Sequence, residues 1–183
     1  MALVKKFPNW KQIKLIIFDF DGVFTNNKVY VDEDGKELVC CDRSDGLGID
    51  MLKIFIKNKN WDVKFFILSK EKNEVVSQRA KKLKIDCFQG ISGKRKFLLN
   101  YLENHFENAE EIKKNIVYLG NDLNDYEVMD IVEFFVAPKD AHLFIKKNAQ
   151  FVINVNGGEG FVRQFIEKLI IAEGFGNIKE FIK

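Results

Sequence analysis

Short apolar runs alternate with helix-like segments along this chain, and that alternation limits the fold more than any other feature. Residues 13–20, 63–68 and 116–119 are such runs, rich in β-branched and aromatic side chains. A short, continuous apolar run of this kind is typical of a strand that is buried on both faces of a parallel sheet. Polar residues follow these runs, at the points where the strands are expected to end.

The segments between the runs have the apolar spacing of helices. In residues 46–59, for example, Leu47, Met51 and Phe55 recur at helical spacing. Further strands are expected at 85–88, 134–137 and 151–155, and further helices at 74–84, 94–106, 125–132, 141–147 and 160–172. The alternation predicts an open, parallel, Rossmann-like α/β sheet with helices on both faces. A length of 183 residues predicts a single domain over residues 1–183.

One β-hairpin interrupts the alternation. Residues 28–31 and 37–41 are strand-like, and they flank residues 32–35, which end in the Asp-Gly pair that is typical of a tight turn. We therefore expect a hairpin over residues 28–41. The last residues, 174–183, are expected to form a C-terminal arm.

The charge balance argues against a nucleic-acid partner. Lys and Arg total 29 against 27 Asp and Glu, which leaves a net charge of +2, and no basic block stands out. No apolar run approaches the roughly 18–20 residues that a membrane span needs. The first residues lack the apolar core of a secretory signal, and the three cysteines form no CxxC pair. We therefore expect a cytoplasmic protein with no membrane or nucleic-acid partner.

Two carboxylates follow the first apolar run. Asp19 and Asp21 flank a single Phe and precede Gly22. At a strand exit both can reach one metal ion, and one can act as a nucleophile while the other is a general acid and base. Taken alone, the motif is equally compatible with a solvated turn, because Asp and Gly are common turn residues.

A second polar cluster changes that balance. Residues 120–125, Gly-Asn-Asp-Leu-Asn-Asp, directly follow another apolar run. Mg²⁺ takes oxygen ligands and is usually held by a few carboxylates together with substrate phosphate oxygens. Taken alone, the cluster is also compatible with a helix N-cap. Two acidic strand ends at one sheet edge favour a metal site.

Ser69 and Lys94 lie at two further strand ends. Ser69 follows the run at 63–68, and Lys94 begins an expected helix. A hydroxyl and a compact cation at neighbouring strand ends can hold a phosphoryl group as it gains charge. Each is weak evidence by itself, and their order along the chain gives them value.

The order Asp-x-Asp, Ser, Lys and acidic cluster resembles the haloacid dehalogenase (HAD) superfamily of phosphotransferases. The likeness is greatest to one branch without a cap domain: the 3-deoxy-D-manno-octulosonate 8-phosphate (KDO 8-phosphate) phosphatases, the acylneuraminate 9-phosphate phosphatases and the HAD domain of some acylneuraminate cytidylyltransferases. The residues that carry it run from 13 to 171 and include residues 22–25, Tyr30, residues 45–49, Gln89, Gly90, Ala141, His142, residues 157–160 and Arg163.

The resemblance implies a Mg²⁺-dependent phosphatase. Asp19 is implied to attack phosphorus and form an aspartyl-phosphate, and Asp21 to protonate the leaving oxygen and then activate water. Ser69 and Lys94 are implied to hold the phosphoryl oxygens. The implied metal ligands are the Asp19 carboxylate, the Asp21 backbone carbonyl and the residue after Gly120. That residue is Asn121, where the branch usually has Asp, so Asp122 or Asp125 is expected to help complete the site.

The resemblance also implies a sugar-acid substrate. The implied substrate-binding residues are Gly22, Lys70, Glu71, Arg79, Lys82 and Arg163. Glu71, Arg79 and Lys82 are similar to the set in acylneuraminate-type enzymes, which favours a nine-carbon nonulosonate 9-phosphate over KDO 8-phosphate. The same charges are also compatible with a solvated helix face.

Members of the branch are homotetramers in which neighbouring subunits close the active site, and we expect the same here. Two other functions compete. A receiver domain also has paired acids, a hydroxyl and a lysine, but the spacing of Asp19 and Asp21 does not fit one. A non-catalytic HAD domain that serves only oligomerisation beside a cytidylyltransferase is the other alternative, and the intact Asp19, Asp21, Ser69 and Lys94 argue against it.

Overall fold

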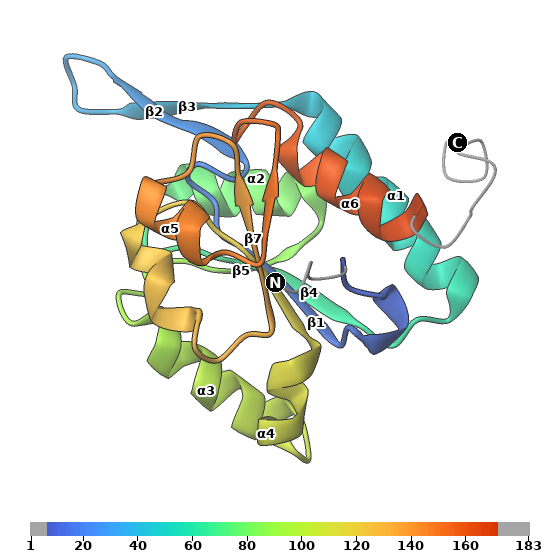
Figure 1. The fold of residues 1–183 in the computed structure, drawn as a ribbon. Coiled ribbons are helices and arrows are strands. Elements are labelled where there is room, and N and C mark those ends of the chain that lie inside the picture. The colour runs from blue at the N-terminus through green and yellow to red at the C-terminus, as the bar shows by residue number, and fades with distance from the viewer. Residues whose placement is uncertain (1–6, 172–183) are drawn as a thin grey trace.

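The computed structural model describes residues 7–171, and its centre is a six-stranded parallel sheet. The strand order is β5-β4-β1-β6-β7-β8. Figure 1 shows the strands at the centre of the molecule, with helices around them. The strands are β1 (Leu15–Phe18), β4 (Lys64–Leu68), β5 (Asp86–Phe88), β6 (Ile116–Leu119), β7 (Phe134–Pro138) and β8 (Phe151–Ile153). The predicted parallel α/β sheet is thus confirmed.

β1 lies in the middle of the sheet and explains why its sequence is apolar at every position. Leu15 aligns with Lys64 of β4 on one side and with Ile116 of β6 on the other. Side chains alternate between the two faces of a strand. Ile16 and Phe18 accordingly belong to one hydrophobic cluster, and the other two residues of β1 belong to a second.

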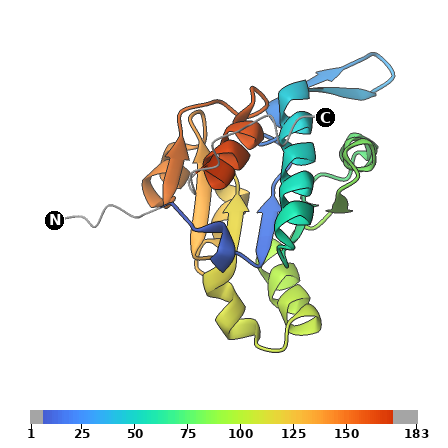
Figure 2. The ribbon, with the colours of Figure 1, turned by 90° about the vertical axis from the view of Figure 1, so that its right-hand side faces the viewer.

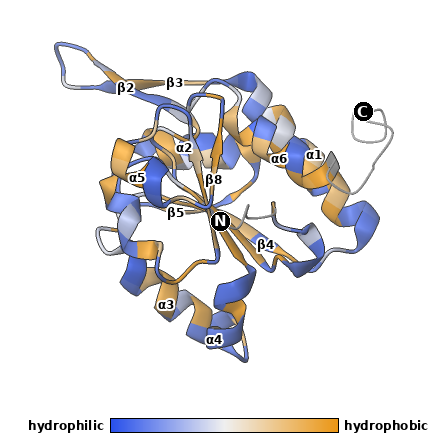
Figure 3. Ribbon diagram, viewed as in Figure 1, coloured by the Kyte–Doolittle hydropathy of each residue, from blue (hydrophilic) through white to orange (hydrophobic). Residues whose placement is uncertain are grey.

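Helices cover both faces of the sheet. Helices α1 (Arg43–Lys59), α2 (Glu74–Leu83) and α6 (Phe161–Ile171) supply the first cluster. The second is covered by α3 (Lys94–His105), η3 (Leu123–Val128) and α5 (Leu143–Asn148). Figure 3 shows orange and blue residues mixed along these helices, as expected where one side faces a core. Short turns η1 (Trp10–Gln12), α4 (Ala109–Ile112) and η2 (Lys113–Asn115) complete the described elements.

Two predicted helices differ most from those observed. α1 begins at Arg43 rather than residue 46, because the Asp42 side chain accepts a hydrogen bond from the Ser44 N–H and caps the helix. The helix expected at 125–132 is instead the 3-10 segment η3, and Asp122 and Asp125 cap its first turn reciprocally. Among the described helices, none combines the length and the apolar character that a membrane crossing requires.

The hairpin forms a separate two-stranded sheet, β2 (Thr25–Val31) with β3 (Glu37–Cys41). It projects from the body of the molecule near the start of α1 (Figure 2). The predicted hairpin is confirmed, although β2 begins at Thr25 rather than residue 28. Its pairing register shifts between Thr25 and Val29. The predicted C-terminal arm at 174–183 lies outside the described residues.

Candidate active site

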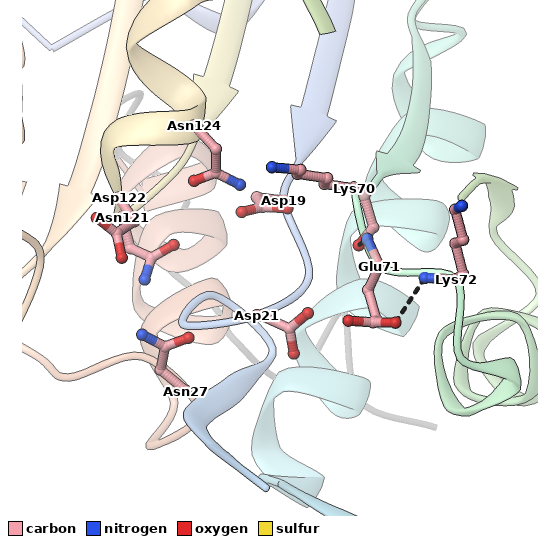
Figure 4. Close-up of a pocket in the computed structure, with 10 residues that line it drawn as sticks. Asp19, Asp21, Asn27, Lys70, Glu71, Lys72, Asn121, Asp122 and Asn124 are labelled. Atoms are coloured by element: carbon pink, nitrogen blue, oxygen red, sulfur yellow. Dashed lines mark hydrogen bonds between the residues drawn. The ribbon is translucent and has the colours of Figure 1, made fainter. Parts of the chain in front are cut away.

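A pocket of about 610 Å³ opens at the carboxyl edge of the sheet, where β1, β4 and β6 end. This is the edge at which open α/β sheets bind ligands. The residues that line it are Asp19, Asp21, Asn27, Ser69, Lys70, Glu71, Lys72, Asn121, Asp122 and Asn124 (Figure 4). Seven of these were predicted from the sequence as site residues; Asn27, Lys72 and Asn124 were not.

Asp19 lies at the floor of the pocket, directly beyond β1. Its side chain is buried, and its Oδ1 lies 2.8 Å from the Lys94 Nζ. Burial raises the pKa of Asp19 to about 8, the negative charge of Asp125 adds to the rise, and Lys94 opposes it. A second cation beside Asp19 would favour its charged form further.

Lys94 reaches Asp19 from the first turn of α3. It is only 1% exposed, and its Nζ also contacts Asp125 Oδ1 at 2.7 Å and the Tyr118 hydroxyl at 3.1 Å. Burial lowers the pKa of Lys94, but Asp19 and Asp125 outweigh that effect and raise it to about 12. Lys94 is therefore a fixed positive charge next to the candidate nucleophile.

Asp125 anchors this arrangement through both of its carboxylate oxygens. Its Oδ1 accepts hydrogen bonds from Lys94 and from the Tyr118 hydroxyl, the latter at 2.7 Å. Its Oδ2 accepts the Asn121 N–H at 2.9 Å and the Asp122 N–H at 3.3 Å. Both oxygens of Asp125 are therefore engaged within the protein, and its help in completing a metal site stays a prediction.

Asn121 is placed as an oxygen ligand would be. It is 6% exposed, and its Oδ1 is buried without a hydrogen-bond partner among the described residues. A buried, unpaired carbonyl oxygen is costly unless something binds it. A Cβ at Gly22 would lie 1.9 Å from the Asn121 Nδ2, so only glycine leaves room for this amide. Gly22, predicted to bind substrate, therefore packs under Asn121 and does not line the pocket.

Asp21 lies on the loop after β1, with the Thr25 hydroxyl 3.4 Å from its Oδ1. Burial raises the pKa of the Asp21 carboxyl, and the charge of Glu71 adds to the rise. A raised pKa increases the protonated fraction, which is the form that a general acid needs.

Ser69 follows β4 and is buried at the pocket wall. Its Oγ accepts a hydrogen bond from the Glu71 N–H at 3.0 Å. The hydroxyl proton can still be donated into the pocket. Lys70 and Glu71 are exposed at the rim, and in Figure 4 the Lys70 side chain extends toward the Asp19 side of the pocket.

Three predicted substrate-binding residues do not line this pocket. Arg79 donates from Nη2 to the Asp42 carbonyl at 3.0 Å. Lys82 is exposed on α2, and Arg163 forms an ion pair with Glu167 at 2.6 Å. The structure therefore does not bring these three residues to Asp19 within one chain, and their contact with substrate stays a prediction.

Few charged side chains in the pocket are arranged to bind a cation. No group of three or more His, Cys, Asp or Glu side chains is arranged for a metal in residues 7–171. Asp19, Asp21 and Asn121 all line the pocket, and the Asn121 Oδ1 is unpaired. Mg²⁺ is commonly bound in this way, by one or two carboxylates together with substrate oxygens.

Comparison with known proteins identifies the family of the chain. No family model matches the chain. The chain is 32% identical over 165 residues to the KDO 8-phosphate phosphatase KdsC of Escherichia coli K12. The alignment covers 90% of this chain and 82% of KdsC. The chain belongs to the KDO 8-phosphate phosphatase family of HAD hydrolases. It is therefore a phosphoric monoester hydrolase, and the resemblance inferred from its motifs is confirmed.

Solved structures agree on the fold. A HAD family hydrolase from Streptomyces avermitilis has a TM-score of 0.77 and 34% identity, covering 90% of this chain and 88% of its own. The KDO 8-phosphate phosphatase of Yersinia pestis has a TM-score of 0.76 and 29% identity, covering 90% and 84%. The Moraxella catarrhalis KDO 8-phosphate phosphatase, at 24% identity, shares the fold with a TM-score of 0.75, and the match covers 88% of this chain and 87% of that one. That protein was solved with magnesium, phosphate and KDO.

Proposed function

We propose that this chain hydrolyses the phosphate ester of a 2-keto-3-deoxy sugar acid, with Mg²⁺ as cofactor. The observation that carries the proposal is the buried pair of Asp19 and Lys94 at 2.8 Å, at the floor of an open pocket on the sheet edge. A nucleophile beside a fixed positive charge suits attack on a phosphate ester. Membership of the KDO 8-phosphate phosphatase family supports the class of substrate.

The residues present fit a magnesium ion. The Asp19 carboxylate, the Asp21 backbone carbonyl and the unpaired Asn121 Oδ1 would hold it, with Asp122 beside them. Bound there, the ion supplies positive charge that offsets the charge on the transferring phosphoryl group.

The side chains divide the reaction between them. A carboxylate oxygen of Asp19 attacks phosphorus, a new O–P bond forms, and the bond from phosphorus to the sugar oxygen breaks. Asp21, whose pKa is raised by burial, gives its proton to that leaving oxygen. Asp21 then takes a proton from water, which attacks the aspartyl-phosphate and releases phosphate and free Asp19. Ser69 and Lys94 hold the phosphoryl oxygens during both steps.

Two sugar acids are candidates. KDO 8-phosphate is the first, because the curated relatives act on it. A nine-carbon nonulosonate 9-phosphate is the second, and Glu71 at the pocket rim favours it because a carboxylate there can accept a hydrogen bond from the acylamino N–H of an acylneuraminate, a group that KDO lacks.

Phosphate release tests both candidates together. Purified protein with Mg²⁺ should release phosphate from one of these esters, and EDTA should abolish the release. A strong preference for KDO 8-phosphate would remove the nonulosonate candidate, and the reverse preference would remove the other. Absence of release from every ester by folded protein would contradict the proposed reaction and favour a role in oligomerisation alone.

We also propose that the chain assembles as a homotetramer through its hairpins. Val29, Tyr30, Val31 and Leu38 are between 54% and 65% exposed on the projecting hairpin. Apolar side chains gathered on an exposed strand pair are a liability unless another surface covers them. Light scattering should give the mass of four chains, and Tyr30→Glu should lower it; a monomeric wild type would contradict the assembly.

A further inference from the structure

Asn27 has an uncommon backbone conformation at the start of the hairpin. Its φ is +59°, in the left-handed region, and it lies where the β2–β3 register shifts between Thr25 and Val29. Glycine adopts this region freely, and Asn tolerates it better than most other residues. Irregular pairing beside an active site commonly redirects a side chain.

That conformation directs the Asn27 side chain into the pocket. Asn27 lines it, and Figure 4 shows its amide on the same side of the pocket as Asn121, while the Asp21 carboxylate points the other way, toward Glu71. The amide has no hydrogen-bond partner recorded among residues 7–171. It therefore presents a free donor and a free acceptor to whatever occupies the pocket.

The backbone of Asn27 is tied to the candidate general acid. The Asn27 N–H donates to the Thr25 Oγ1 at 3.1 Å, and the Gly22 N–H donates to the same oxygen at 3.2 Å. The Thr25 hydroxyl in turn donates to Asp21. One hydroxyl thus sets the position of Asn27 relative to Asp21.

The chemistry beside Asp21 defines what Asn27 can meet. A general acid must lie next to the oxygen that leaves, so another pocket-lining residue of the same loop is within reach of the sugar that carries this oxygen. A sugar carries hydroxyls near that oxygen, and a carboxamide can both donate to a hydroxyl and accept from one.

We propose that Asn27 is a specificity-determining residue that hydrogen-bonds a hydroxyl of the leaving sugar. The assignment rests on the proposed function, because it requires a hydroxylated leaving group. An aryl phosphate, whose leaving group has no hydroxyl beside the ester, should gain nothing from Asn27.

The chain offers a matched control. Asn60 is also an exposed Asn with a positive φ, +48°, but it ends α1 and does not line the pocket. Glycine fits both backbones without strain, so Asn27→Gly and Asn60→Gly each remove a carboxamide and should fold. Both variants relieve the same backbone strain, so an effect seen in Asn27→Gly and not in Asn60→Gly comes from the carboxamide at the pocket.

The experiment measures kcat and KM for the preferred sugar-acid phosphate and for p-nitrophenyl phosphate. Asn27→Gly should lower kcat/KM about tenfold for the sugar ester, as expected for one lost hydrogen bond, and leave the aryl ester unchanged. Asn60→Gly should change neither. Equal losses of Asn27→Gly on both esters would make Asn27 a support of the loop, and no loss on either would make it a bystander; both results overturn the proposal.

Failure of the proposed function would look different. Wild-type protein that hydrolyses p-nitrophenyl phosphate but neither sugar ester would refute the substrate class and, with it, the role of Asn27. Wild-type protein that is inactive toward every ester would refute the proposed reaction itself.

Discussion

The Tyr118 hydroxyl and the Lys94 ammonium share one acceptor, the Oδ1 of Asp125, each at a distance of 2.7 Å. Lys94 also contacts the Tyr118 hydroxyl and Asp19, so its three N–H groups all have partners within the protein. Binding of a phosphoryl oxygen by Lys94 therefore requires it to exchange or share one of these contacts.

Removal of the Tyr118 hydroxyl tests this arrangement. Tyr118→Phe keeps the ring, which stacks on Phe135, but deprives Lys94 and Asp125 of a buried partner. We expect a loss of about 1–3 kcal/mol in the free energy of unfolding, because buried polar groups lose a hydrogen bond, together with a lower kcat. Urea unfolding and phosphate release measure the two effects.

Tyr101→Phe is the control for that substitution. Tyr101 packs against Phe66 and Phe88 in the same hydrophobic cluster. Its variant should keep kcat at the wild-type value. If Tyr118→Phe also kept both its stability and its kcat, the hydroxyl would have no positioning role.

Asp19→Asn tests the nucleophile. An amide cannot attack phosphorus in place of the carboxylate, so turnover should fall by at least about a thousandfold. Circular dichroism should show an intact fold, since the substitution removes a buried charge and keeps the shape. Asp34→Asn, in the exposed hairpin turn, is the control. Retained turnover in Asp19→Asn would assign the nucleophile elsewhere.

Asn121→Asp tests the metal ligand. A negative charge in place of the buried Asn121 carbonyl should tighten Mg²⁺ binding about tenfold, because affinity follows the charge of the ligands. Isothermal titration calorimetry measures the affinity directly. Asn124→Asp adds the same charge at the exposed pocket rim and should have a much smaller effect. Equal effects of the two variants would exclude Asn121 as a ligand.

Asp45 should make stability depend on pH. It is fully buried and accepts the Arg163 N–H at 2.9 Å, at the start of α6. Burial raises the pKa of Asp45 to about 6, although the hydrogen bond from the Arg163 N–H opposes the rise. Because the folded state holds the proton more tightly than the unfolded state, the contribution of Asp45 to stability falls as pH rises from about 4 to about 6.

Asp45→Asn removes that titration. Relative to the variant, the wild type should lose up to about 3 kcal/mol of unfolding free energy across this pH range and show no further change above it. Urea unfolding at several pH values measures the difference. Asp50→Asn, on the exposed side of α1, should leave the pH profile as it is. Parallel profiles for the wild type and Asp45→Asn would contradict the titration.

Local patterns in the sequence were sufficient for much of the fold. β6 was predicted at its exact bounds, because Ile116–Leu119 is apolar throughout and ends at a glycine. The strand ends also located Asp19, Asp21, Ser69 and Asn121. These predictions succeeded because a parallel sheet brings all its carboxyl ends to one edge.

The sequence could not predict features that depend on the direction of a side chain. Arg79 was expected at the substrate; within one chain it donates to the Asp42 carbonyl, a tertiary contact that charge alone cannot reveal, and its contact with substrate stays a prediction. Asn27 lines the pocket at the point where the hairpin register shifts, and no local pattern in the sequence indicates that shift. Tyr118 had one local signal, a hydroxyl within an otherwise aliphatic strand, and buried hydroxyls need partners.

The central position of β1 has a consequence for synthesis of the protein. β1 precedes both of its neighbours, which are encoded about 50 and about 100 residues later, a high sequence separation for a first pairing. The apolar β1 therefore stays unpaired until β4, and then β6, have emerged from the ribosome. Asp19 can contact Lys94 only after about half of the chain has been translated, so a shorter nascent chain would expose apolar surface without yet being an enzyme.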